Sequence, residues 1–166
     1  TKPFITKIIT PNCFITDFGD KHEKIAGYKE LAYLHPNHFS PNPEILEQLG
    51  VEEDERFSVL RFISWDALHD SGHHGFTLEL KRKAVEELQK FGKVFISSEG
   101  ALPEDLEQYR LTTKPEDIHH VIAYASLFFG ESGTMATEAA ILGTPSVRVS
   151  SLAKLLGNFR ELKEQY

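Results

Sequence analysis

Cysteine, tryptophan and methionine are scarce in this sequence, which has one residue of each among 166. The single cysteine, Cys13, excludes an internal disulfide and a cysteine-based zinc site, and it fits a reducing cytosol. No apolar run comes near the length of about 20 residues that a membrane span needs, and no signal peptide is recognisable. Basic residues are outnumbered, and a net charge of −7 argues against nucleic acid or anionic membranes as partners, although a local basic pocket stays compatible with it. We therefore expect a cytoplasmic protein without a transmembrane segment.

The hydrophobic content of 40% is enough for one core, and thus for one main domain. Residues 1–42 show little regular pattern beyond a possible strand at 5–10, and we interpret them as an irregular interdomain connection packed on the main domain. Residues 43–166 then form that domain. The chain starts at Thr1 and stops inside an apparent helix at 155–166. We expect a piece of a larger protein, truncated at its carboxyl end.

Apolar runs and helical stripes alternate along residues 43–149. They predict strands at 56–63, 93–97, 109–112, 127–129 and 146–149, and helices at 43–49, 77–91, 103–108, 115–124 and between Ser132 and Gly143. Alternation of this kind indicates an α/β fold, a Rossmann-like three-layer sandwich with a parallel sheet of about five strands. Ligands are expected at the carboxyl ends of such strands.

The stretch LFFGESGTMATEAAILGTPSVRV, residues 127–149, predicts a βαβ unit with small residues at its first turn. The turn holds Glu131, Ser132, Gly133 and Thr134, and exposed amides at a helix start favour an anion such as phosphate. Strand-to-helix turns also carry Gly and Ser for geometry alone. Glu138 favours the ligand interpretation, because a carboxylate on an alanine-rich helix face can accept hydrogen bonds from a ribose diol.

Two further loops at the expected rim carry polar and aromatic residues. The first, 64–76, reads SWDALHDSGHHGF and holds Trp65 and His69. Its length favours a ligand-facing loop over a solvated one. The second, 112–120, reads TTKPEDIHH and includes Thr113 and His119. His119 and the next histidine are adjacent on a helix and face different ways, so they cannot belong to one site. The spacing matches no metal signature, and we expect neither a metal nor a cofactor.

The run FFGESGTMATEAAILGTPSVRV, preceded by IHHVIAYA, resembles the carboxyl-terminal, donor-binding half of glycosyltransferase-B fold proteins. The non-hydrolysing UDP-N-acetylglucosamine epimerases share that design. The stretches GYKELAYLHP, LRFISWDALHDSGHHG and ESGTMATEAAILGTP are similar, closer still, to an uncharacterised prokaryotic glycosyltransferase-like family, a domain of unknown function. This resemblance covers nearly the whole chain.

The resemblance implies a role for each matching residue. Ser132, Gly133 and Thr134 would hold the diphosphate of a nucleotide-sugar, most simply a UDP-sugar, and Glu138 would bind the ribose hydroxyls. The segment from Thr113 to His119 would lie against the base. The catalytic base of such enzymes commonly comes from the amino-terminal domain, and we expect that domain to be a partner missing from this chain. His69 is the speculative catalytic residue within the chain, since a histidine near neutral pKa could meet the leaving phosphate.

Three functions stay open from the sequence. The first is the donor-binding domain of a metal-independent glycosyltransferase in surface polysaccharide or glycoconjugate biosynthesis. The second is a nucleotide-sugar epimerase of the same fold. The third is a module that binds a nucleotide or sugar phosphate without turnover, and a structural platform without a ligand is the remaining interpretation.

Overall fold

The computed structural model describes residues 4–63, 76–149 and 161–162. The chain forms two compact units. One comprises Thr1–Phe39 together with Leu152–Tyr166, and the other comprises Ser40–Ser151.

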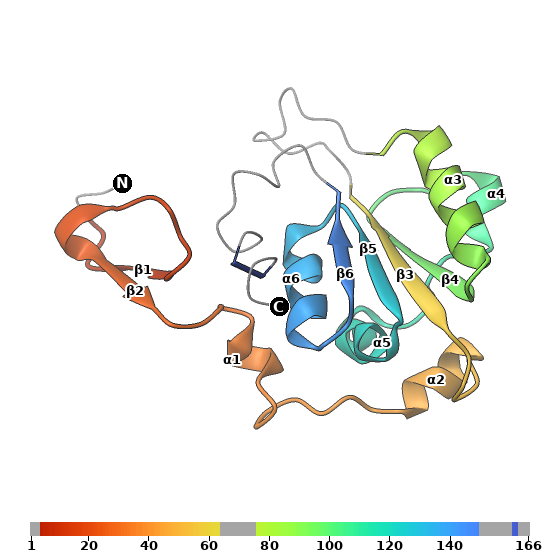
Figure 1. Ribbon diagram of the computed structural model, residues 1–166, viewed down its shortest axis with the longest axis horizontal. Coiled ribbons are helices and arrows are strands. Elements are labelled where there is room, and N and C mark those ends of the chain that lie inside the picture. Colours follow the sequence, from red (N-terminus) through yellow and green to blue (C-terminus); the bar gives the residue numbers. More distant parts are fainter. Residues whose placement is uncertain (1–3, 64–75, 150–160, 163–166) are drawn as a thin grey trace. The chain divides into compact units, whose positions relative to one another are not determined.

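The larger unit, Ser40–Ser151, is built on a parallel sheet of four strands in the order β4-β3-β5-β6 (Figure 1). The strands are β3 (Phe57–Phe62), β4 (Lys93–Ser98), β5 (Leu127–Gly130) and β6 (Ser146–Arg148). This arrangement confirms the expected Rossmann-like α/β fold.

The fifth strand expected at 109–112 is reduced to one parallel bridge between Ile96 and Arg110. Its backbone contacts with β4 are Ile96 N–H to Tyr109 O at 2.7 Å and Leu111 N–H to Ile96 O at 2.9 Å. The next residues are Thr112, which is exposed, and Thr113. They offer no apolar side chain that an extended pairing would bury, so the ladder ends there.

Helices follow the strands in the predicted alternation. They are α2 (Glu44–Leu49), α3 (Leu78–Gln89), α4 (Glu104–Glu107), α5 (Ile118–Tyr124), which continues a 3-10 turn η3 (Pro115–Asp117), and α6 (Gly133–Ile141). Local chemistry sets two of these starts. The Thr77 hydroxyl accepts a hydrogen bond from Leu80 N–H, and the Ser132 hydroxyl accepts one from Met135 N–H, each at 3.3 Å.

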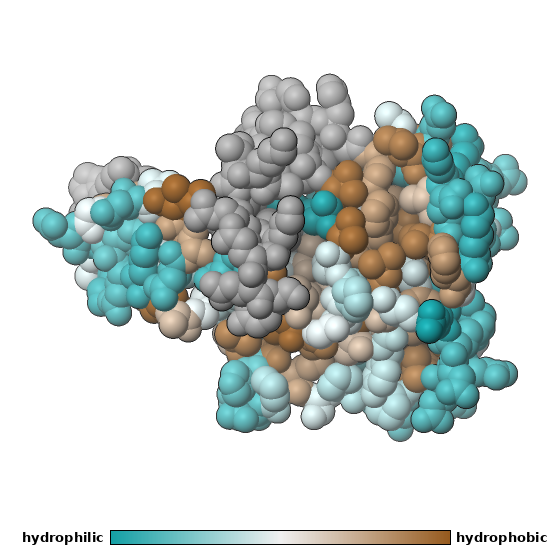
Figure 2. Space-filling model, in the orientation of Figure 1, coloured by the Kyte–Doolittle hydropathy of each residue, from teal (hydrophilic) through white to brown (hydrophobic). Residues whose placement is uncertain are grey.

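The strand order places helices on both faces of the sheet. The chain passes from β3 to β4 in one direction and from β5 to β6 in the other, so right-handed crossovers put α3 and α6 on opposite faces. Val85 of α3 belongs to a buried cluster with Leu60 and Phe62 of β3. Because side chains alternate along a strand, Arg61 points to the opposite face, where α6 lies. Figure 2 shows hydrophilic residues along the outer side of α3 and apolar residues between that helix and the strands.

The smaller unit contains a second parallel pair, β1 (Ile8–Pro11) with β2 (His22–Ile25), in which Ile8 is paired with His22. A 3-10 turn, η2 (Gly19–Lys21), precedes β2, and a short helix, α1 (Leu31–Leu34), follows it. The sequence pattern predicted one strand here and missed the second. The role of residues 1–42 as an interdomain connection stays a prediction.

Candidate functional site

Strands β3 and β5 form the topological switch point of the larger unit, since the connections that follow them leave in opposite directions. Ligands of open α/β sheets bind in the crevice outside the carboxyl ends of such strands. Glu131 follows β5 directly and is 2% exposed. Its carboxylate accepts hydrogen bonds from Ile63 N–H at 3.2 Å and Phe76 N–H at 2.7 Å. Glu131 therefore binds Ile63, the residue before the predicted ligand loop, and Phe76, the last residue of that loop.

The first turn of α6 lies at this point of the sheet. The Ser132 hydroxyl caps the amide of Met135. The amides of Gly133 and Thr134 have no acceptor within the described ranges. Thr134 is exposed and Gly133 is half-buried. These two N–H groups, at the positive end of the helix dipole, are the donors that the sequence predicted for an anion.

A cation that the sequence did not single out lies beside these amides. A Cβ atom placed on Gly133 would be 3.1 Å from Cζ of Arg148 and 3.3 Å from its Nη2. Arg148 ends β6, and burial lowers the pKa of its guanidinium below the ordinary value. A guanidinium and a helix amino terminus share one sign of charge, so an anion between them would be stabilised by both. Gly133 makes room for this approach.

Glu138 and His119, which the sequence assigned to ribose and base, contact each other. Nε2 of His119 on α5 lies 3.2 Å from Oε1 of Glu138 on α6. Glu138 is 6% exposed, so its carboxylate is held at the helix interface rather than in solvent. The two adjacent histidines do face different ways, because His120 accepts a hydrogen bond from Asn42 N–H at 3.1 Å.

A basic pocket, with a volume of about 350 Å³, opens beside the first turn of α6. Its lining includes Arg61 of β3, Arg110, Lys114 and Met135 of α6, and it brings in Thr113, a predicted ligand residue. The sequence indicated the loops at this rim, including the one that carries Lys114, but not that Arg61 and Arg110 would join it, because those two residues come from predicted strands. Trp65 and His69, the remaining predicted site residues, lie outside the described residues.

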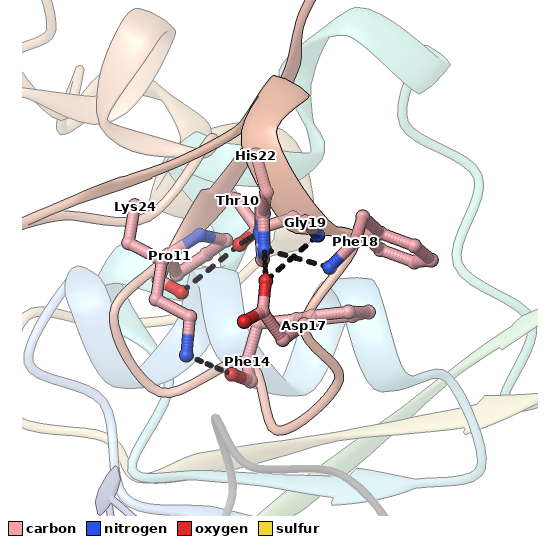
Figure 3. A network of polar contacts seen from close by, with 8 residues as sticks. All are labelled: Thr10, Pro11, Phe14, Asp17, Phe18, Gly19, His22 and Lys24. Atoms are coloured by element: carbon pink, nitrogen blue, oxygen red, sulfur yellow. Dashed lines mark hydrogen bonds and ion pairs between the residues drawn. The ribbon is translucent and has the colours of Figure 1, made fainter. Parts of the chain in front are cut away.

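A second polar cluster lies in the smaller unit (Figure 3). The imidazole of His22 lies between the hydroxyl of Thr10, 2.7 Å from Nε2, and the carboxylate of Asp17, 3.3 Å from Nδ1. Phe18 N–H donates to Nδ1 at 3.2 Å, so in the neutral ring the proton is on Nε2 and is donated to Thr10. The imidazole then cannot take the proton of the Thr10 hydroxyl. This cluster orders a turn and does not activate a nucleophile.

The same turn gives a pH-dependent prediction. The Gly19 amide and, second, the His22 ring in its protonated form hold the pKa of the Asp17 carboxyl below its ordinary value. Its stabilising contacts are therefore complete above the ordinary carboxyl pKa and are lost as the pH falls through the lower, folded-state pKa. In an NMR titration we expect Asp17 to titrate below a model aspartate. An Asp17→Asn variant should keep its thermal midpoint more nearly constant on acidification, and an Asp17 titration at or above the ordinary value would contradict this.

No group of three or more His, Cys, Asp and Glu in the described ranges is arranged to hold a metal ion. No helix in that part of the chain has the length and apolar content needed to cross a bilayer.

The parallel sheet with its helices makes this a Rossmann-like α/β protein, and a polar pocket lies at the carboxyl ends of its strands. A family model described as "Protein of unknown function (DUF354)" matches residues 1–162, and the chain belongs to that family. No curated protein and no solved structure matches the chain. The resemblance to an uncharacterised family is thus confirmed, and the relationship to the glycosyltransferase-B fold belongs to the proposal below.

Proposed function

We propose that the larger unit is the donor-binding domain of a glycosyltransferase-like enzyme and binds a nucleotide-sugar, most simply a UDP-sugar. The observation that carries this proposal is the meeting of two positive features at the switch point: the amides of Gly133 and Thr134, and the guanidinium of Arg148. Together they form a place for a diphosphate. The activity would need the amino-terminal domain expected from the resemblance.

The next turns of α6 supply the complementary part of the proposed site. Glu138 is five residues after Gly133, about 7.5 Å along the helix axis. A carboxylate at that distance from a bound phosphate is within reach of a ribose attached to it. The contact with His119 holds the carboxylate in one orientation, which reduces the entropy lost when it accepts hydrogen bonds from a diol.

Catalysis in this proposal depends on electrostatics. Charge builds on the departing diphosphate during transfer of a sugar, and preorganised donors stabilise it without rearranging. The α6 amides and Arg148 would provide that stabilisation. The same donors would serve an epimerase, so product analysis of the chain joined to its partner domain distinguishes the two: a transferase releases nucleotide and forms a glycoside, whereas an epimerase returns an isomerised sugar.

The direct test is Glu138→Ala. We expect this variant to bind UDP more weakly by about 1–3 kcal/mol, roughly 5- to 150-fold in Kd, because charge-assisted hydrogen bonds to the ribose are lost. Isothermal titration calorimetry of wild type and variant measures the change. Thermal melting of both proteins without ligand separates lost binding from lost folding.

The matched control is Glu86→Ala, which removes an exposed glutamate from α3 and should leave the Kd for UDP unchanged. Equal UDP affinity in wild type and Glu138→Ala would remove the ribose assignment. If the wild type binds no nucleoside diphosphate or nucleotide-sugar in a thermal-shift screen, the proposed function itself is wrong.

A further inference from the structure

We propose that the basic pocket beside α6 is a separate binding site for a phosphate monoester of a small organic molecule. The pocket shares Thr113 with the segment assigned above to the nucleotide base, but the cations that carry this proposal differ from the α6 amides, Arg148 and Glu138. The pocket is lined by Arg61, Arg110 and Lys114, and none of its described lining residues is acidic. In a chain with a net charge of −7, three cations around one hollow are a local concentration of positive charge.

Two of these cations are held in fixed orientations by carboxylates outside the lining. Arg61 donates from Nη2 to Glu99 at 2.5 Å and from Nη1 to the Ser97 hydroxyl at 2.7 Å. Arg110 donates from Nε and Nη2 to Glu107. Glu99 balances the charge of Arg61, and Glu107 balances the charge of Arg110. The exposed ammonium of Lys114 then gives these five side chains one net positive charge. A dianionic phosphate fits such a group, because the arginines are already oriented and lose little entropy on binding.

Two buried polar atoms among the lining residues add an independent observation. Nε of Arg61 and Oγ1 of Thr113 are shielded from solvent and make no hydrogen bond within the described ranges. Buried donors without a partner are rare in folded proteins, since each costs about 1–3 kcal/mol. An oxyanion accepts from both a guanidinium and a hydroxyl. The wall of the pocket therefore holds polar groups that the described residues leave unsatisfied.

Size and lining determine the rest of the ligand. The volume of about 350 Å³ is at the lower end of the range for small-molecule sites and exceeds what a bare phosphate ion would fill. Met135 and Ile118 line the pocket as well and give it an apolar wall. The ligand is therefore a phosphate group attached to a small organic part, such as a sugar or a nucleoside, with the phosphate toward the basic residues.

The test is the double variant Arg110→Gln/Lys114→Gln, titrated by calorimetry with ribose 5-phosphate and with UMP. Both side chains are at the surface, whereas Arg61 is part of β3 and hydrogen-bonds to Ser97 and Glu99, so its loss could disturb folding. We expect the Kd to rise at least tenfold for the phosphate monoester that the wild type binds. Binding of only one of the two compounds identifies the source as a sugar phosphate or a nucleotide. Arg82→Gln is the matched control, because Arg82 also makes a two-pronged ion pair, with Asp105, but lies outside the pocket.

Several results would overturn the proposal. One is a wild type that binds neither compound at millimolar concentration, and the second is a double variant that binds with the same Kd as the wild type and Arg82→Gln. The second result would place the phosphate at the start of α6 instead. Uridine or ribose binding as tightly as the phosphorylated compounds would also overturn it. The nucleotide-sugar function is tested separately, because Glu138→Ala is expected to weaken UDP binding while leaving the pocket intact.

Discussion

Replacing Gly130 with alanine is expected to destabilise the larger unit by about 3 kcal/mol or more, at the upper end of what overpacking costs. An added Cβ would lie 2.5 Å from the carbonyl oxygen of Arg61 and 2.8 Å from both its N and Cβ atoms. These are mainly backbone atoms of the neighbouring strand, so no side chain can rotate away. Relief requires β3 and β5 to separate where Arg61 and Gly130 are paired. Urea denaturation followed by circular dichroism measures the loss.

The matched control is Gly100→Ala. A Cβ on Gly100 would meet nothing within 4 Å, and its backbone does not need the left-handed region. Its free energy of unfolding should stay within about 0.5 kcal/mol of the wild type, as for most surface changes. A Gly130→Ala protein as stable as Gly100→Ala would mean that the strands at the switch point are less closely paired than in this structure.

Gly130 also illustrates what sequence can and cannot predict here. The run Leu127, Phe128 and Phe129 predicted a strand because three apolar residues in a row indicate burial, and β5 is that strand. The same logic found β3, β4 and β6, each within one or two residues. It failed at 109–112, where the pattern was short and polar residues followed. The sequence around Gly130 does not show that Arg61 of β3 is paired with it, because that pairing depends on the order of the strands in the sheet.

The candidate site divides in the same way. A small-residue turn followed by a helix is a local pattern, so Ser132, Gly133 and Thr134 could be proposed from sequence alone. Their assignment to a diphosphate stays a prediction. Arg148 and the basic pocket could not be found this way, since their side chains meet only after the sheet has formed. A basic residue near the carboxyl end of three of the five predicted strands, Arg61, Arg110 and Arg148, was the available signal, because carboxyl ends of parallel strands share one edge.

Glu131→Gln is expected to lower the free energy of unfolding by about 2–4 kcal/mol. The carboxylate accepts one hydrogen bond with each oxygen, from Ile63 N–H and Phe76 N–H. Glutamine offers one acceptor only, and its NH₂ group would face the other amide, donor against donor. The loss combines a hydrogen bond to a charged group with a buried amide left unsatisfied, each worth about 1–3 kcal/mol. Urea denaturation gives the total, and amide hydrogen exchange at Ile63 and Phe76 should accelerate locally.

Glu99→Gln is the control, because the Glu99 side chain is 43% exposed and its ion pair with Arg61 should contribute at most about 1 kcal/mol. The comparison also determines what Glu131 does. If Glu131 only positions the residues around it, Glu131→Gln would lower the free energy of unfolding and accelerate amide exchange, and UDP affinity would fall only as a consequence. As a direct ligand of the nucleotide, it would weaken UDP binding with the unfolding free energy unchanged. We expect the first result, since backbone amides already occupy both oxygens of this buried carboxylate.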